Sequence, residues 1–315
     1  MLIKELYEKI HKNISLRISG KDNVIDRVLI AVIAGGHVLL DDVPGTGKTT
    51  LAKALASSVD GTYSRVQFTP DLLPTDITGV NVYDMKKQEF SFRKGAVFTN
   101  ILLADEINRA APRTQSALLE CMEEKQVTAD GVTFRLPEPF LVIATQNPVE
   151  LQGTFPLPEA QLDRFLFCLR MGYPERDKEK EMLSRALNGI AVLRSVASCE
   201  DILNAQKELQ SVRIADAVQD YLLDIAKASR EHSSIKTGLS PRGLLALADA
   251  SRGYAAIKGR GYVTPDDVKA VAADVMAHRL ILKGASYGDK LEEKRKTAED
   301  ILEKVSVPKD QIWNC

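Results

Sequence analysis

The chain has little of what marks secreted, metal-binding or membrane-spanning proteins. Its 315 residues include one tryptophan, four cysteines without a C-x-x-C pair and four histidines without an H-x-x-x-H pair. We therefore expect reduced thiols and no zinc site built from these residues. The N-terminal segment MLIKELYEKIHKNIS lacks the apolar core of a signal peptide, and the apolar runs are too short to span a bilayer. These absences predict a cytoplasmic protein.

An excess of charge of one sign is also missing. Lysine and arginine together number 42 and aspartate and glutamate 43, which gives a net charge of −1. This balance argues against a protein that binds DNA or RNA through bulk electrostatic attraction. The 44% hydrophobic and 27% charged fractions are those of an ordinary globular protein, and the length favours two domains.

Apolar segments alternate with helices in the first half of the chain. A pattern that is apolar all round predicts a helix over 24–34, which stops at Gly35-Gly36, and a second helix is predicted over 48–58. Continuous apolar strands between helices indicate a parallel sheet covered on both faces, and therefore an α/β fold. The predicted strands are 37–40, 63–68, 101–104, 140–145 and 165–170.

Two segments interrupt this alternation. Residues 70–95 contain several prolines and glycines, with possible short strands at 80–84 and 88–93. Residues 126–136 carry a hairpin signal at Asp130-Gly131. Both are predicted to be hairpin insertions, and such loops commonly act on something outside the domain.

The composition changes near 172–175. Charged helical segments follow, and Ser240-Pro241 and Thr264-Pro265 each have the pattern of a helix N-cap followed by proline. We predict an α/β domain over 1–173 and an all-helical domain over 174–315. The first predicted helices of the second domain are about 175–187, 200–210 and 214–231.

The segment from Asp42 to Thr49 lies between a predicted strand and a predicted helix. It matches the phosphate-binding pattern G-x-x-x-x-G-K-[ST], except that Asp42 stands in place of the first glycine. Glycines let backbone N–H groups surround a phosphate, and the helix presents its positive N-terminus to the same anion. Lys48 would reach the β- and γ-phosphates, and the Thr49 hydroxyl would hold Mg²⁺. A glycine-rich turn with a chance lysine is the alternative.

Polar side chains end two further apolar strands. Asp105 and Glu106 follow 101–104, and ligands bind at the carboxyl ends of strands in open parallel sheets. Asp105 is placed to hold the Mg²⁺ shell and Glu106 to polarise the attacking water. A carboxylate base favours an ATPase over a Ras-type GTPase, which orients its water with glutamine. Asn147 ends the next strand and would hydrogen-bond the γ-phosphate or the water.

Four blocks carry a resemblance to a known family. They are PGTGKTTLAKALA, ILLADEINRAAPRTQSALLECMEEKQVT, IATQNPVELQGTFPLPEAQLDRFLF and LSPRGLLALADASRGYA. Together they resemble MoxR-family AAA+ ATPases over about residues 15–285. The resemblance implies an α/β domain with a five-stranded parallel sheet, a helical lid and a ring, usually hexameric, with ATP and Mg²⁺ between subunits. MoxR proteins resemble the magnesium-chelatase motor subunit and share its extra hairpins.

The resemblance also implies roles for individual residues. Asn147 corresponds to sensor 1, Arg164 to an arginine finger offered to the neighbour's nucleotide, and Arg242 to sensor 2 on the lid. Arg242 stands in the first turn of a helix, where a cation opposes the helix dipole unless an anion is near. Arg109 and Arg113 are lesser candidates for subunit contact. The implied nucleotide-binding set is Val24, Ile25, Pro44, Gly45, Thr46, Gly47, Lys48, Thr49, Thr50 and Asp105, with Thr49 and Asp105 as Mg²⁺ ligands.

The favoured function is an ATP-driven chaperone that remodels or activates a client protein complex. The resemblance implies partners with von Willebrand factor A domains, and neither nucleic acid nor membrane insertion is expected. Three alternatives remain. A nucleic-acid motor shares the AAA+ core, but the chain has no basic stripe with interleaved aromatics. A chelatase-type motor subunit for metal insertion is the second, and an inert nucleotide-binding scaffold the third.

Overall fold

A five-stranded parallel sheet forms the centre of the molecule. The computed structural model describes residues 2–43, 45–86, 88–147, 153–188, 192–284 and 291–308. The strand order is β10-β1-β9-β6-β3, and every neighbouring pair is parallel. All five predicted strands are present, with no end shifted by more than two residues, and the α/β prediction is confirmed. The strands are β1 (Val38–Asp41), β3 (Tyr63–Gln67), β6 (Ile101–Asp105), β9 (Leu141–Gln146) and β10 (Phe167–Leu169).

Both faces of this sheet are covered along β1, β6, β9 and β10, which explains why these four strands are almost wholly apolar, whereas the edge strand β3 is only partly buried. Ile101 and Leu103 of β6 belong to an apolar cluster with α1, α2 and α3, whereas Leu102 and Ala104 belong to a second cluster with α5. Alternate side chains of one strand point to opposite faces, so a strand buried on both sides must be apolar throughout. The covering helices are α1 (Leu2–Ser15), α2 (Asp22–Ala34), α3 (Lys48–Ser58) and α5 (Pro112–Glu124).

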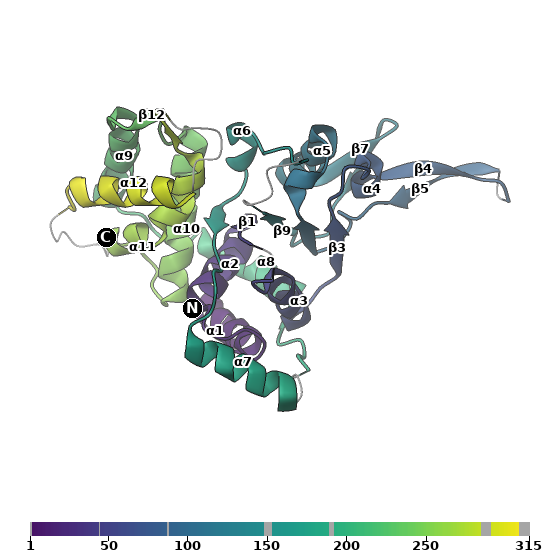
Figure 1. Cartoon of the computed structure of the whole chain (residues 1–315), viewed down its shortest axis with the longest axis horizontal. Coiled ribbons are helices and arrows are strands. Elements are labelled where there is room, and N and C mark those ends of the chain that lie inside the picture. The colour runs from purple at the N-terminus through teal and green to yellow at the C-terminus, as the bar shows by residue number, and fades with distance from the viewer. Residues whose placement is uncertain are drawn as a thin grey trace.

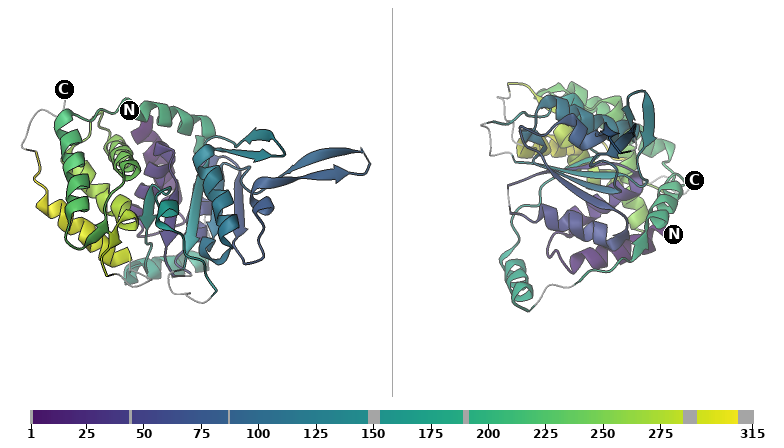
Figure 2. Two further views of the ribbon diagram at one scale, coloured as in Figure 1. Left: turned by 90° about the horizontal axis from the view of Figure 1, so that it is seen from above. Right: turned by 90° about the vertical axis from the view of Figure 1, so that its right-hand side faces the viewer.

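Two hairpins project from this core on the side of β3 (Figures 1 and 2). The Phe92 and Phe134 rings stack at 4.1 Å between centroids, and Asn81 Nδ2 donates to Asp130 Oδ2 at 2.6 Å. These two contacts join the hairpins into one unit, and both hairpin predictions are confirmed. The first comprises α4 (Pro74–Thr78), β4 (Gly79–Asp84) and β5 (Glu89–Lys94), and the second β7 (Gln126–Ala129) and β8 (Val132–Arg135).

The C-terminal part is a helical lid, as predicted, with short strands that the sequence pattern did not indicate. α8 packs against α1 and α2 of the N-terminal part, so the division at 173 and 174 stays a prediction.

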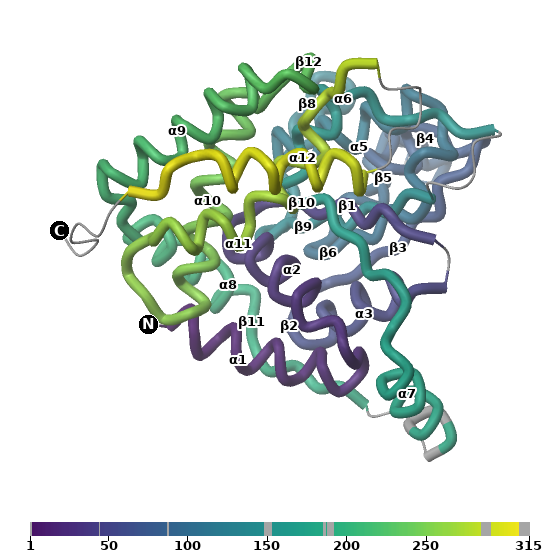
Figure 3. Tube along the Cα trace, turned by 60° about the vertical axis from the view of Figure 1, so that its left-hand side comes forward, coloured from purple at the N-terminus to yellow at the C-terminus, as the bar shows by residue number. Residues whose placement is uncertain are grey.

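α7 lies at the edge of the molecule, away from the sheet (Figure 3). The helices are α7 (Arg176–Asn188), α8 (Cys199–Leu209), α9 (Asp216–Glu231), α10 (Pro241–Ile257), α11 (Pro265–Met276) and α12 (Leu291–Lys304). The short strands are β11 (Ala197–Ser198), which pairs with β2 (Val59–Asp60), and β12 (Ile235–Thr237), which pairs with β13 (Ile281–Leu282).

Charged side chains tie the lid to the α/β part of the same chain. Arg27 Nε of α2 lies 2.8 Å from Asp274 Oδ2 of α11, and both side chains are buried. Arg295 of α12 binds the other oxygen of the Asp274 carboxylate. None of the described helices is long and apolar enough to cross a membrane.

Candidate active site

The order of the strands brings the predicted motifs to one edge of the sheet. β9 lies between β1 and β6, and all three run parallel. Lys48 begins α3 directly after the loop that follows β1, β6 ends at Asp105, and Asn147 directly follows β9. Asn147 therefore follows the strand that lies between the strand before the phosphate-binding loop and the strand that ends in the paired carboxylates.

The phosphate-binding loop has the backbone that its glycines predict. Gly45 and Gly47 have φ of 85° and 96°, in the left-handed region that glycine adopts without strain, and α3 begins at Lys48. Lys48 Nζ donates to the Asp42 carbonyl oxygen at 2.6 Å. Burial lowers the pKa of Lys48, and the carboxylates of Asp42 and Asp105 oppose this shift. Pro44 lies outside the described residues.

Asp42 has a structural role that accounts for the departure from the glycine pattern. Its Oδ2 accepts a hydrogen bond of 2.6 Å from the Gly172 N–H, just after β10, and its Oδ1 accepts one of 2.8 Å from the Val43 N–H. The carboxylate thus fixes the start of the loop against the chain that leaves the sheet toward the lid.

Thr145 of β9 organises the pair of carboxylates. Its hydroxyl donates to Asp105 Oδ1 at 2.6 Å and accepts from the Glu106 N–H at 2.8 Å. The second oxygen of Asp105 lies 2.7 Å from Arg65 Nη2 of β3. Neither Thr145 nor Arg65 was predicted. The only sequence signal for Arg65 is a cation within a predicted strand, which does not say which neighbouring strand it faces.

Glu106 is held in a sparsely populated conformation. Its φ is 55°, which costs a non-glycine residue of order 1 kcal/mol or more and is frequent at functional sites. Gln67 Nε2 donates to its Oε2 at 2.8 Å, and Arg109 Nη1 lies 2.9 Å from the same oxygen. Gln67 and Arg109 therefore hold the Glu106 carboxylate in one orientation. Gln67 was not predicted, and Arg109 was predicted only as a subunit contact.

The other residues predicted to contact the nucleotide differ in how far their side chains are exposed. Asn147 is buried, and its carbonyl accepts from Asn108 Nδ2 at 3.4 Å. Val24 keeps a small exposed surface at the start of α2, whereas Ile25 is fully covered by protein. Thr46 Oγ1 donates to the Val43 carbonyl at 3.2 Å. Adenine packing on Val24 and Ile25 stays a prediction.

The donor set fits a nucleotide bound with Mg²⁺. Thr49 and Asp105 offer oxygen ligands, which Mg²⁺ prefers, and Mg²⁺ is commonly held by one or two protein oxygens together with phosphates. The loop has glycines at positive φ and leads into the eleven-residue helix α3, and the first N–H groups of a helix are free to bind an anion. This combination suits a di- or triphosphate chain.

Arg164 and Arg242 lie together, because both bind the carboxylate of Glu123. Arg164 Nε lies 2.6 Å from Glu123 Oε2, and Arg242 Nη2 binds Glu123 Oε1. The hydrogen bonds from Arg164 and then Arg242 lower the pKa of Glu123. Both arginines line a groove of about 320 Å³ between α5, α10 and the C-terminal end of α2, and Lys48, Asp105 and Glu106 are not among its lining residues.

Comparison with known proteins agrees with this geometry. Residues 37–167 match the family described as "ATPase family associated with various cellular activities (AAA)", and residues 227–305 match the AAA lid domain. The chain is 43% identical over 283 residues to "Chaperone MoxR1" of Mycobacterium tuberculosis, covering 87% of this chain and 75% of that protein. The chain belongs to the MoxR family of AAA ATPases.

Two further likenesses extend over nearly the same length. This MoxR-family chain is 51% identical over 265 residues to the uncharacterised protein YeaC of Bacillus subtilis, covering 84% of this chain and 83% of the relative. A solved structure of an ATPase candidate from Cytophaga hutchinsonii superimposes with a TM-score of 0.88 at 39% identity, covering 98% of this chain and 96% of that one. The fold of that solved structure therefore extends over nearly all of this chain.

Proposed function

We propose that the protein hydrolyses ATP to ADP and phosphate with Mg²⁺ and uses the energy to remodel a client protein complex. The observation that carries the proposal is the convergence of Lys48, Asp105, Glu106 and Asn147 at one sheet edge. Lys48 and the backbone N–H groups of the loop would hold the phosphates, and Thr49 and Asp105 the Mg²⁺. Bound Mg²⁺ neutralises charge on the phosphate oxygens. Glu106 would take a proton from the attacking water.

The position of the two arginines supports completion of the site by a neighbouring subunit. Arg164 and Arg242 share Glu123 in a groove that the chain's own phosphate-binding residues do not line. An arginine contributes to phosphoryl transfer only when it reaches the phosphate, where it is worth about 10³–10⁵ in rate. We infer that both act on the nucleotide of the next subunit in a ring, and we propose a hexamer of the cytoplasm.

The joined hairpins supply the surface for a client. Their exposed apolar side chains at the far end include Tyr83, Met85 and Phe90, and Met85 is 87% exposed. Exposed apolar patches on a projecting element mark protein-binding sites. A partner with a von Willebrand factor A domain would bring the client to this surface. We also propose the division of the chain into a nucleotide-binding domain over 1–173 and a lid over 174–315.

Two variants test the chemistry. Lys48→Ala should lose nucleotide binding, measured with a fluorescent ADP analogue. Glu106→Gln should bind ATP with unchanged affinity but release phosphate about 10²–10⁴ times more slowly, the range of general-base contributions. Equal steady-state phosphate release by the wild type and Glu106→Gln would refute the assignment of Glu106 as the base.

Mixing tests the supply of arginines from a neighbour. Arg164→Ala and Lys48→Ala should each be inactive alone, and their mixture should recover part of the activity. The reason is that a Lys48→Ala subunit can offer its arginines to an intact loop in an Arg164→Ala subunit. The specific activity of the wild type should also fall on dilution. Normal hydrolysis by Arg164→Ala as an isolated monomer would contradict the proposal.

A further inference from the structure

Arg279 is a buried arginine of the lid that binds the segment carrying Arg164. Only 6% of the residue is exposed, although it bears a full charge. Its Nε donates to Asp163 Oδ1 at 2.6 Å, and burial lowers its pKa while Asp163 opposes that shift. Burying an arginine destabilises the fold unless its N–H groups find hydrogen-bond acceptors, so the acceptors around Arg279 are a required part of the structure.

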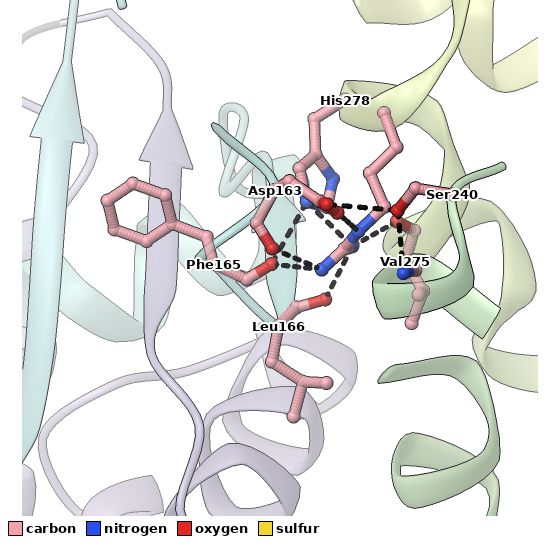
Figure 4. Close-up of polar contacts among 8 residues, drawn as sticks. Asp163, Phe165, Leu166, Ser240, Val275 and His278 are labelled. Carbon is pink, nitrogen blue, oxygen red and sulfur yellow. Dashed lines mark hydrogen bonds and ion pairs between the residues drawn. The ribbon is translucent and has the colours of Figure 1, made fainter. Parts of the chain in front are cut away.

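Those partners are the residues that precede and follow Arg164 in the sequence. Arg279 Nη2 donates to the carbonyl oxygens of Asp163 at 3.1 Å and Phe165 at 2.7 Å, and Nη1 donates to that of Leu166 at 3.3 Å. Figure 4 shows these carbonyls turned toward the lid. The peptide group before Arg164 and the peptide groups that follow Phe165 and Leu166 are thereby held by one planar guanidinium, which lysine cannot imitate because it offers a single point charge.

The same centre fixes the helix that carries Arg242. The second oxygen of Asp163 accepts from Ser240 Oγ at 2.9 Å, and Ser240 is the N-cap of α10, whose Gly243 N–H donates to that hydroxyl at 2.9 Å. A Cβ on Gly243 would lie 2.9 Å from Arg279 Cδ, so the glycine leaves space for the Arg279 side chain. One ion pair therefore orients both the Arg164 segment and the first turn of α10.

We propose that Arg279, paired with Asp163, is a positioning residue that sets Arg164 and Arg242 in the orientation from which they reach the neighbouring subunit's nucleotide. Glu123 is the meeting point of the two arginines within the chain. Arg279 binds the backbone on both sides of Arg164 directly and reaches the first turn of α10 through Asp163 and Ser240. Arg279 itself touches no phosphate. The proposal rests on the function proposed above, in which both arginines act on the next subunit.

Arg279→Lys is the variant of choice, because it keeps a cation beside Asp163 but loses the hydrogen bonds to the carbonyls. Its affinity for fluorescent ADP should stay within about twofold of the wild type, since its own loop is intact. Its kcat should fall about 10²-fold or more, because a misplaced arginine loses part of the rate enhancement that a neighbour's arginine provides. A mixture with Lys48→Ala should recover activity, because Lys48→Ala subunits bring well-placed arginines. A mixture with Arg164→Ala should not.

Arg27→Lys is the matched control, a second buried arginine that joins the lid to the α/β part through Asp274. It should keep kcat near that of the wild type even if it unfolds at lower urea concentration. Should Arg279→Lys fail to fold, Asp163→Asn removes the charge of the pair at constant shape and should show the same pattern of recovery.

Three results would overturn the proposal. The first is a kcat of Arg279→Lys within threefold of the wild type. The second is an Arg279→Lys variant that is inactive and stays inactive when mixed with Lys48→Ala, although Lys48→Ala restores activity to Arg164→Ala. The arginines would then act on a neighbour without Arg279 positioning them. The third is the absence of rescue for Arg164→Ala itself, which removes the proposed action on the neighbour and the role of Arg279 with it.

Discussion

The guanidinium of Arg65 lies 2.7 Å from the carboxylate of Asp105, the residue expected to hold Mg²⁺. Arg65 belongs to β3 and Asp105 to β6, which are neighbours in the sheet. A cation at this distance competes with a metal ion for the same oxygen, since both are attracted to one negative charge. Arg65 is partly exposed, so its hold on Asp105 is modest and reversible.

The first prediction follows from this competition. Arg65→Gln should lower the Mg²⁺ concentration that half-saturates the binding of fluorescent ADP, by about two- to fivefold, as expected from the loss of an exposed ion pair. A Mg²⁺ titration at fixed ADP measures it. Arg93→Gln on β5 is the control, because it removes an exposed arginine of a projecting hairpin. A higher Mg²⁺ requirement in Arg65→Gln would show that Arg65 assists the phosphates instead.

The second prediction concerns the attachment of the lid. Asp274→Ala should lower the free energy of unfolding by about 3–5 kcal/mol, because it leaves Arg27 without its buried partner and also removes the pair with Arg295. Urea unfolding measures this change. Glu8→Ala, which breaks an exposed pair with Lys4 at 3.9 Å, should change it by less than about 1 kcal/mol. Equal effects of the two variants would mean that the lid is held by other contacts.

The third prediction is a loss of stability in acid. His37 is buried, its Nδ1 accepts from the Val142 N–H at 3.0 Å, and its Nε2 lies 3.1 Å from the Met122 carbonyl oxygen, to which it donates as a neutral ring. Burial lowers its pKa from 6.5 to about 4. As the pH falls below 6.5 the unfolded chain binds the proton first, so the folded state loses about 1.4 kcal/mol per pH unit down to about pH 4.

A second histidine adds to this slope. Burial first, and then the charge of Arg279, hold the pKa of His278 well below its usual value. The wild type should therefore lose stability faster than one histidine explains, and His37→Gln should remove about one proton from the pH dependence. Urea unfolding between pH 7.5 and 5 measures both slopes. An unchanged slope in His37→Gln would show that His37 is already charged in the folded protein.

The local motifs could be predicted from the sequence because their information is contained in a few consecutive residues. The glycines of the phosphate-binding loop have positive φ as expected, and the helix begins at Lys48. The apolar strands were also recognisable, since a strand buried on both faces needs no polar alternation. The hairpin at Asp130-Gly131 has both residues at positive φ, as its turn chemistry requires.

The partners of the site were not predictable in the same way. Arg65 and Gln67 reach the two carboxylates only because β3 and β6 are neighbours in the sheet. The order of strands in a sheet cannot be deduced from the residues of either strand. Arg109 was expected at a subunit contact, and it pairs with Glu106 within the chain. Pairings of this kind depend on how separate elements pack.

The α/β core, the two hairpins, the helical lid and the phosphate-binding loop could be predicted before any coordinates, because each depends on local spacing and on the periodicity of apolar residues. The meeting of Arg164 and Arg242 at Glu123, which is 41 and 119 residues away from them in the chain, depends on long-range packing and could not. That meeting requires the lid to be docked through Arg279 and Asp163, and docking is set by the packing of whole surfaces and by the need to satisfy a buried charge.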